Sequence, residues 1–308
     1  MKVYLQNIKT IQGVENVVLT QRDGFPINSA GVWLSQKEIF SVSSASSAIY
    51  SVANSINNSR LKSLLVEGDM AKIFLTPLPK TDEYFLTLTA QSKANLGAIY
   101  VEARNSVESL QSLLLSSNAD FKPPLIFFSQ EEVEEILNNF SLKEQDEFPL
   151  TISNYNLIVN EEVSKDIENC LSSLIRSVPE VNRIFISLSG GHVISYRTKY
   201  SEAADRTLAA MAYSLFDTAN RIFWILKKSM INKILCESYN NFLFVYGLNN
   251  AILCIEVKKE GNTRIGLLRL LFSSYIKALN ELLDKLRASK PQIPSLSFED
   301  VFQSLVVR

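Results

Sequence analysis

Apolar residues along this chain follow a helical spacing in some segments and form short unbroken runs in others. Segment 44–65 has apolar residues at i, i+3 and i+4 spacing, which predicts a helix. By the same argument, helices are predicted over 3–12, 96–115, 161–177, 201–228 and 265–286. Hairpins are predicted at 17–27 and 184–194, and further strands at 64–67, 72–75, 84–89, 233–237, 242–246 and 251–256.

This pattern contains two copies of one unit. Segments 17–27 and 184–194 each consist of an apolar strand, a glycine turn and a second apolar strand. Segments 95–101 and 264–270, about 169 residues apart, each carry a glycine just before a helical pattern. Both copies give the order α-β-β-α-β-β-β-α with tight strand connections. This order predicts an α+β fold, with a five-stranded, mainly antiparallel sheet and helices in each copy.

The repeat and the length indicate the same domain count. A chain of 308 residues suggests about two domains. We expect the first domain at 1–115, an acidic linker with a helix at 116–158, the second domain at 159–288 and a tail at 289–308. The acidic stretch from Glu131 to Glu147 is either a docking strip or a solvated helix with linker, and we favour the second interpretation.

Charge and composition exclude some classes of protein. The chain carries 31 basic and 32 acidic residues, so no basic surface indicates nucleic-acid binding. The N-terminal residues lack the apolar stretch of a signal peptide, and no apolar run approaches the roughly 20 residues that span a bilayer. Three cysteines, an odd and sparse count, are typical of reduced thiols. We therefore expect a cytoplasmic protein.

The residues for catalysis are sparse. His192 is the one histidine, and it lies beside a predicted hairpin turn, so no Ser-His-Asp or Cys-His arrangement can be built elsewhere. Cys236 and Cys254 fall in predicted strands and are interpreted as core residues rather than metal ligands. No phosphate-binding G-x-x-x-x-G-K-[ST] motif occurs. We expect no catalytic site, no cofactor and no metal.

The element order, the hairpin residues Asp23–Ile27 and the Asn95-Leu96-Gly97 opening of the last helix resemble the Roadblock family (dynein light chain roadblock type), which is related to longin-like folds. The second copy keeps Gly266 but has Arg264 at the asparagine position, and is therefore more divergent. The resemblance implies non-catalytic modules that dimerise by aligning their long middle helices and joining edge strands into one sheet. It also implies scaffolds or regulators of Ras-like small GTPases, or adaptors on motor complexes.

A tandem copy could form that dimer within one chain, so we expect a monomeric pseudo-dimer, with a higher oligomer as the alternative. Helix 201–228 has an apolar stripe and further aromatic residues off the stripe, which indicates a second buried contact; the alternative is a helix buried in a thick core. The outer face of the first long helix is more polar. The predicted interdomain or partner interface comprises Ile49, Val52, Ile56, Leu208, Met211, Leu215, Phe216, Ile222, Phe223 and Trp224.

Three functions remain open at the level of sequence. The first is a scaffold or regulator of a Ras-like small GTPase, with Arg22, Arg60 and Arg197 as exposed arginines that could act in trans, although each is more often a surface residue. The second is a small-molecule sensor or structural adaptor. A sensor needs a cavity with convergent polar groups, and the strand patterns show no buried polar residues. The third and weakest is an enzyme.

Overall fold

The computed structural model of the chain describes most of both predicted domains. The described residues are 1–31, 35–56, 60–81, 83–116, 129–131, 134, 161–188, 191–199, 206–227, 229–249, 251–261 and 263–288. The predicted tail and most of the predicted linker lie outside them, as does most of the acidic stretch that begins at Glu131.

Both halves have the predicted element order. The first half consists of α1 (Lys2–Lys9), β1 (Val14–Gln21), β2 (Pro26–Gly31), α2 (Gln36–Ile56), β3 (Leu61–Gly68), β4 (Ala71–Pro77), β5 (Tyr84–Gln91) and α3 (Leu96–Ser116). The second half consists of α5 (Glu161–Ser177), β6 (Val181–Ser187), β7 (Val193–Thr198), α6 (Arg206–Lys227), β8 (Ile231–Ser238), β9 (Asn241–Gly247), β10 (Ile252–Lys258) and α7 (Ile265–Ala288). The α-β-β-α-β-β-β-α order is thus confirmed in each half.

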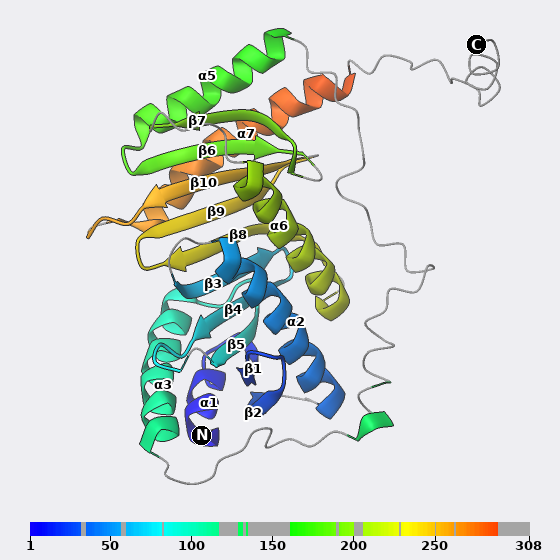
Figure 1. Cartoon of the computed structure of the whole chain (residues 1–308), viewed down its shortest axis with the longest axis vertical. Helices are drawn as coiled ribbons and strands as arrows, with labels where there is room; N and C mark the ends of the chain where they lie inside the picture. The colour runs from blue at the N-terminus through cyan, green and yellow to red at the C-terminus, as the bar shows by residue number, and fades with distance from the viewer. Residues whose placement is uncertain are drawn as a thin grey trace, which may run out of the picture.

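The two halves share one ten-stranded sheet in the order β2-β1-β5-β4-β3-β8-β9-β10-β6-β7 (Figure 1). Neighbouring strands are antiparallel, and each half contributes five of them. The halves meet where β3 pairs with β8, and Leu65 lies opposite Leu235. Strand order runs outward from this pair in the same way on both sides. The chain is therefore an α+β pseudo-dimer with an approximate two-fold axis at Leu65 and Leu235.

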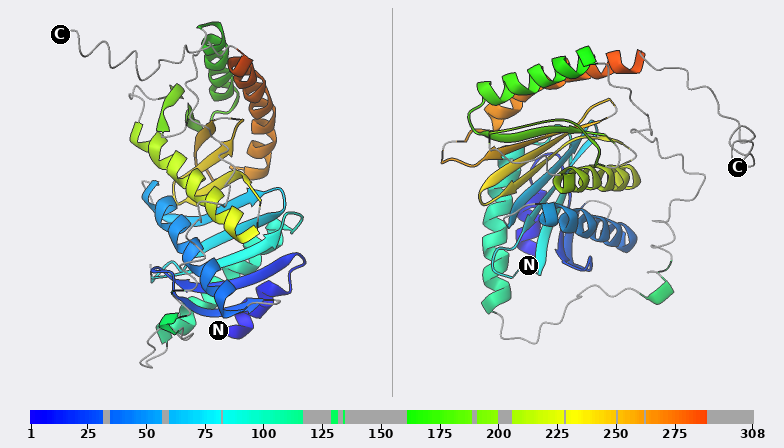
Figure 2. Two further views of the ribbon diagram at one scale, coloured as in Figure 1. Left: turned by 90° about the vertical axis from the view of Figure 1, so that its right-hand side faces the viewer. Right: turned by 45° about the horizontal axis from the view of Figure 1, so that its top comes forward.

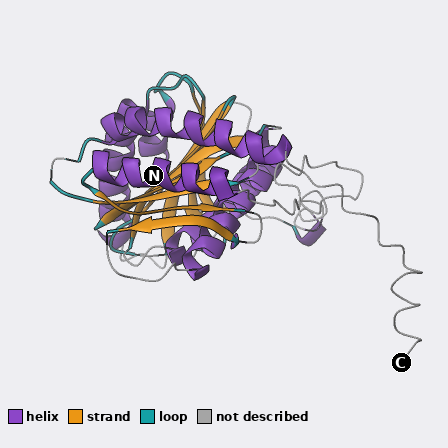
Figure 3. Cartoon of the chain, turned by 90° about the horizontal axis from the view of Figure 1, so that it is seen from above, coloured by secondary structure: helices purple, strands orange, loops and turns teal. Residues whose placement is uncertain are grey.

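Helices cover both faces of the sheet (Figures 2 and 3). The core on one face contains residues of α2 and α6, and the core on the other contains residues of α1, α3, α5 and α7. Side chains alternate between these cores along a strand, as the pleat requires. Leu65 and Leu235 belong to the four-helix face, while their neighbours Leu64 and Ile234 belong to the α2–α6 face.

The predicted bounds of the first long helix were wrong at both ends. Helix α2 begins at Gln36, because Ser35 and Glu38 form a capping box: the Glu38 N–H donates to the Ser35 hydroxyl at 3.2 Å, and the Ser35 N–H donates to the Glu38 carboxylate at 2.8 Å. The helix ends at Ile56, and Leu61 already belongs to β3. The apolar periodicity had extended the predicted helix to residue 65. The residues from Leu61 onward form a strand instead, because they pair with β8.

The first hairpin has a three-residue turn at residues 22–24, and the second hairpin is closed by the equivalent backbone hydrogen bond. In the first hairpin, the Gln21 N–H donates to the carbonyl oxygen four residues later at 2.8 Å, and Gly24 has φ of 99°. In the second hairpin, the Leu188 N–H makes the same bond at 2.8 Å, and Gly191 has φ of 82°. A glycine with positive φ closes a turn of this length without strain.

Candidate functional site

Helices α2 and α6 lie side by side on one face of the sheet and contact each other (Figure 1). Leu226, near the end of α6, packs on Ile39 and Val42, near the beginning of α2. The two helices therefore run antiparallel, as the approximate two-fold axis requires. This pair of helices, named here the paired-helix face, is formed jointly by both halves.

The structure brings most of the predicted interface residues into one cluster. Its buried members are Ile49, Ile56, Leu215, Phe216, Ile222 and Phe223. Val52 and Leu208 are partly buried and pack against it. Met211 and Trp224 lie outside the cluster; Met211 is 36% exposed and Trp224 is half-buried. The predicted residues thus fall into a buried group between the helices and the sheet, and a smaller group toward solvent.

Phe223 lies against a glycine of the other half. A Cβ atom added to Gly68, at the end of β3, would lie 2.7 Å from Cε1 of the Phe223 ring and 2.4 Å from the carbonyl oxygen of Met230. Phe216 uses a similar space inside the second half, where a Cβ on Gly247 would lie 2.7 Å from its ring. Phe216 and Phe223 are therefore core residues, unlike Trp224, and the one that reaches across the halves is Phe223.

The outward side of the paired-helix face carries small and polar side chains. On α2, the exposed residues include Ala48, Ser51 and Ser55. On α6, Met211, Ser214 and Arg221 are exposed. Small side chains lose little conformational entropy when a partner covers them. Its alanine and serine side chains would therefore lose little conformational entropy on being covered, in contrast to Met211 and the arginine.

One exposed ion pair lies on the same side of α6. Nε of Arg221 lies 2.8 Å from a carboxylate oxygen of Asp217, one helical turn earlier. Such exposed pairs contribute little to stability, because water and salt screen the charges. Both charged groups of this pair remain partly open to solvent.

A charged cluster crosses the junction on the opposite face of the sheet. The carboxylate of Glu67 in β3 binds Arg269 of α7 and lies 3.5 Å from Nζ of Lys233 in β8. Burial lowers the pKa of Lys233 because desolvation outweighs the attraction of Glu67. The corresponding Glu237 binds Lys259 and accepts a hydrogen bond from a serine of β3 at 3.1 Å. The sequence analysis did not predict this charged cluster. The signal that could have indicated it was the acidic residue at the end of the apolar run Leu64-Leu65-Val66-Glu67.

The other candidate residues from the sequence are three arginines and the histidine. The Arg197 guanidinium donates to the Glu168 carboxylate at 2.7 Å and to the Ser172 hydroxyl at 3.1 Å, which holds it against α5. Arg22 is exposed, and Arg60 lines a cavity on the other face of the sheet. His192 is an exposed turn residue, as predicted.

The predicted core cysteines are buried in strands. Burial raises the pKa of Cys236 to about 12 and raises that of Cys254 well above its ordinary value, so both are thiols at neutral pH. Within the described residues, no group of three or more His, Cys, Asp or Glu side chains could hold a metal ion. No helix among these residues is long and apolar enough to cross a membrane.

The fold and the paired helices define a tandem of two small α+β modules joined into a pseudo-dimer. Residues 2–90 match the family model described as the Roadblock/LC7 domain. The first half therefore carries a match to the Roadblock/LC7 domain, in agreement with the resemblance, and the second half repeats the element order and strand pairing of the first.

Solved structures of single domains are similar to parts of the chain. A Roadblock/LC7 domain from Streptomyces avermitilis is 17% identical, and the match covers 38% of this chain and 98% of that one with a TM-score of 0.35. Myxococcus xanthus MglB is 16% identical, with 44% and 99% covered and a TM-score of 0.39. The gliding protein MglB from Thermus thermophilus is 13% identical, with 42% and 97% covered and a TM-score of 0.38. No curated protein matches the chain in sequence.

Proposed function

We propose that this chain is a non-catalytic interaction protein that acts as a scaffold or regulator of a Ras-like small GTPase through its paired-helix face. The observation that carries the proposal is the side-by-side packing of α2 and α6, one from each half, on a continuous sheet. That arrangement is what the Roadblock resemblance implies for a dimer, and here one chain makes it alone.

The dimensions of the face suit a protein partner. Helices α2 and α6 have 21 and 22 residues, which corresponds to a length of about 30 Å each at the rise of an α-helix. A stable protein interface covers about 800 Å² on each partner. Two adjacent helices of this length provide a surface of that order.

The outward residues differ between the two helices, so a partner would bind in one orientation. Gly24 lies against Ser44 of α2, and Gly191 lies against Ala210 of α6, which makes these two helical positions equivalent. By this alignment, Arg221 of α6 corresponds to Ser55 of α2. A small GTPase at these two positions would therefore meet a guanidinium on α6 and a serine hydroxyl on α2.

The proposal is tested by capturing purified Ras-like GTPases of the source organism, loaded with a GTP analogue or with GDP, on the immobilised protein. We expect capture that depends on the nucleotide and is lost when Ser214→Arg and Ser51→Arg are combined, because bulky charges would block close approach. The matched control is Leu270→Arg, an exposed position of α7 on the opposite side of the sheet.

Two results would count against the proposal. If Ser51→Arg and Ser214→Arg leave capture unchanged while Leu270→Arg abolishes it, the partner binds the four-helix face. If no GTPase is captured in either nucleotide state, the chain does not act on this class, and a structural adaptor role replaces the proposed one.

A further inference from the structure

A cavity of about 530 Å³ lies in the first half, on the face of the sheet opposite α2 and α6. It is bounded by β3, β4 and α3, and by the end of β8 from the second half. Its size falls within the range of small-molecule sites. The lining includes Ser63 and Thr76 on strands, so polar groups of the sheet reach the cavity, contrary to the expectation from the strand patterns.

The second half provides an internal comparison for this cavity. The pairs Leu64–Leu75 and Ile234–Val245 occupy the same register in β3–β4 and β8–β9, so Thr76 corresponds to Tyr246. The motifs at Gly97 and Gly266 make Ala103 of α3 correspond to Phe272 of α7. Two small residues in the first half therefore stand where two aromatic residues stand in the second.

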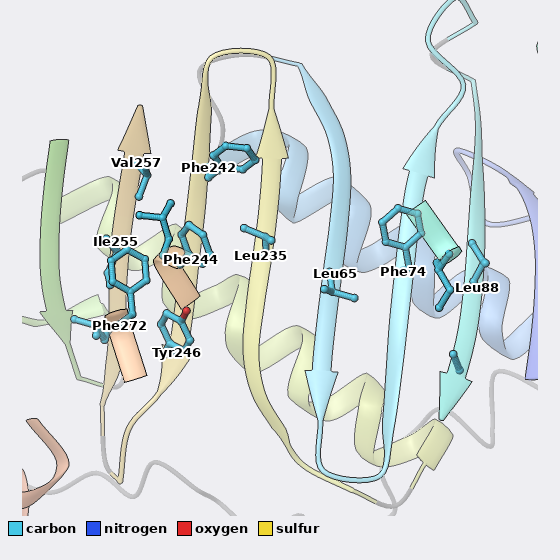
Figure 4. Close-up of a cluster of buried hydrophobic side chains, with 14 of the residues drawn as sticks. Leu65, Phe74, Leu88, Leu235, Phe242, Phe244, Tyr246, Ile255, Val257 and Phe272 are labelled. Carbon is cyan, nitrogen blue, oxygen red and sulfur yellow. The ribbon is translucent and has the colours of Figure 1, made fainter. Parts of the chain in front are cut away.

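These aromatic residues pack tightly in the second half. The ring centroid of Phe272 lies 5.2 Å from that of Phe244 and 6.4 Å from that of Tyr246. Figure 4 shows the three rings grouped on one side of Leu65 and Leu235, with Phe74, the counterpart of Phe244, on the other side. The cavity thus lies where the first half has Thr76 and Ala103 and the second half has two rings.

The charges at the cavity favour an anion. Arg60, Lys62 and Arg104 line it, against the carboxylates of Glu108 and Glu237. Each carboxylate already has a basic partner: Glu108 lies 3.3 Å from Arg104, and Glu237 binds a lysine outside the lining. The lining therefore carries an excess of positive charge. An acidic group of a ligand would gain charge-assisted hydrogen bonds there.

The apolar part of the cavity favours a planar ring. The rings of Phe74 and Tyr100 lie edge to face with centroids 4.7 Å apart, and Nζ of Lys62 lies 4.2 Å from the centroid of the Tyr239 ring. Aromatic side chains bind flat rings by stacking or by edge contacts. The Tyr100 hydroxyl is buried near Ser63 and completes no hydrogen bond of normal geometry among the described residues. Burial raises the pKa of Tyr100 to about 12, so this hydroxyl stays protonated and can donate.

We infer that this cavity is a binding site for a small organic anion with a planar aromatic body, held by Lys62 and its basic neighbours at the rim and by Phe74 and Tyr100 inside. The site lies on the opposite face of the sheet from the paired-helix face, and the inference does not depend on the proposed GTPase role.

The test uses two fluorescent probes that differ in one charge: anilinonaphthalene sulfonate and phenylnaphthylamine, which has the same rings without the sulfonate. On the full chain we expect one sulfonate probe per molecule, bound at least about tenfold more tightly than the neutral probe, which is the scale of one charge-assisted contact. Lys62→Ala should weaken binding of the sulfonate probe by a similar factor and leave the neutral probe unchanged.

Variants that copy the second half identify the site. Ala103→Phe restores the missing ring and should abolish binding of both probes, and Thr76→Tyr tests the same space if the first variant fails to fold. Leu270→Ser removes a side chain that is 72% exposed on α7 and should leave binding intact. The inference is overturned if folded Ala103→Phe or Thr76→Tyr protein binds the sulfonate probe like the wild type. It is also overturned if Leu270→Ser removes the signal, because the probe then reports an exposed apolar patch.

Discussion

The two halves have the same element order and strand pairing, and they differ in the side chains between the sheet and the last helix. In the second half, Phe272 of α7 packs against Phe244 and Tyr246 of β9. In the first half, Ala103 and Thr76 occupy the corresponding positions, and a cavity lies beside them. Duplication of a fold thus conserves register and topology, while single positions decide whether a core is closed or hollow.

The junction between the halves shows a similar difference on its polar side. Glu67 is buried and binds two cations of the second half, Arg269 and Lys233. Its counterpart Glu237 accepts a hydrogen bond from a serine hydroxyl of the first half, and its ion pair with Lys259 lies within the second half. The approximate two-fold axis therefore relates the strands and not the charges, which gives a partner or ligand two distinguishable sides.

The largest effect is expected where the halves share a buried ring. Phe223→Asp places a charge with no basic partner against Gly68, so the free energy of unfolding should fall by more than about 4 kcal/mol. Chemical denaturation followed by circular dichroism measures this loss. Met211→Asp, at a 36% exposed position of the same helix, is the control and should cost less than about 1 kcal/mol. Similar losses for both variants would contradict the assigned helix faces.

The next largest effect concerns the filled core of the second half. Phe272→Ala should lower the free energy of unfolding by about 3–5 kcal/mol, because it leaves a cavity like that of the first half. Phe25→Ala removes a ring that is 37% exposed and should cost less. Denaturation curves of both variants test the difference. Equal losses would mean that Phe272 does not fill the part of the second half that corresponds to the cavity beside Ala103.

A smaller loss of stability is expected from substitution of Gly68, the glycine against which the Phe223 ring packs. A Cβ at Gly68 meets a backbone oxygen at 2.4 Å, so Gly68→Ala should cost about 1–3 kcal/mol. Gly266 in α7 has open space at its Cβ position, and Gly266→Ala should be neutral or stabilising by up to about 1 kcal/mol. Thermal melting of the two variants gives the comparison. If Gly68→Ala does not change the melting temperature, Phe223 and Met230 do not pack closely on Gly68.

The smallest effect is a decrease of the free energy of unfolding at alkaline pH, to which one thiol of the second half contributes. The pKa of Cys236 is raised from 9.0 to about 12 by burial, whereas the corresponding residue of β3 is Val66. Between these values the folded state keeps a proton that the unfolded state loses, so stability falls as pH rises. The thiol should contribute a loss of about 1 kcal/mol between pH 7 and pH 10.

Denaturation at the two pH values tests this contribution, and Cys236→Ala should lose correspondingly less stability than the wild type. Lys233 acts in the opposite direction, because its lowered pKa makes the folded state release its proton first as pH rises. An unchanged pH dependence in Cys236→Ala would mean that the thiol is not held neutral by burial.

Local signals in the sequence were sufficient for the element order and for the two repeated hairpins. Glycine turns and short apolar runs act over a few residues, and the helix predicted at 96–115 forms as α3. The beginning of α2 was also predictable, because Ser35 and Glu38 are a capping-box pair that was overlooked.

The rest depends on contacts between residues far apart in the chain. Leu61 belongs to a strand because β8 pairs with β3, and Gly68 is required because Phe223 covers it. The cavity is lined by Thr76 and Ala103, which lie in different elements, and neither small residue predicts a hollow by itself. Sequence periodicity identified the faces of helices, and it could not identify which residues of distant segments meet.

The pseudo-dimer requires that β3 and β8 pair within one chain. Light scattering across a wide concentration range measures whether they do, because an uncovered β3 or β8 would expose an edge strand that associates with other chains. We expect a constant mass of 34.7 kDa. A mass of twice this value would mean that the halves pair between chains and would contradict the intramolecular pseudo-dimer.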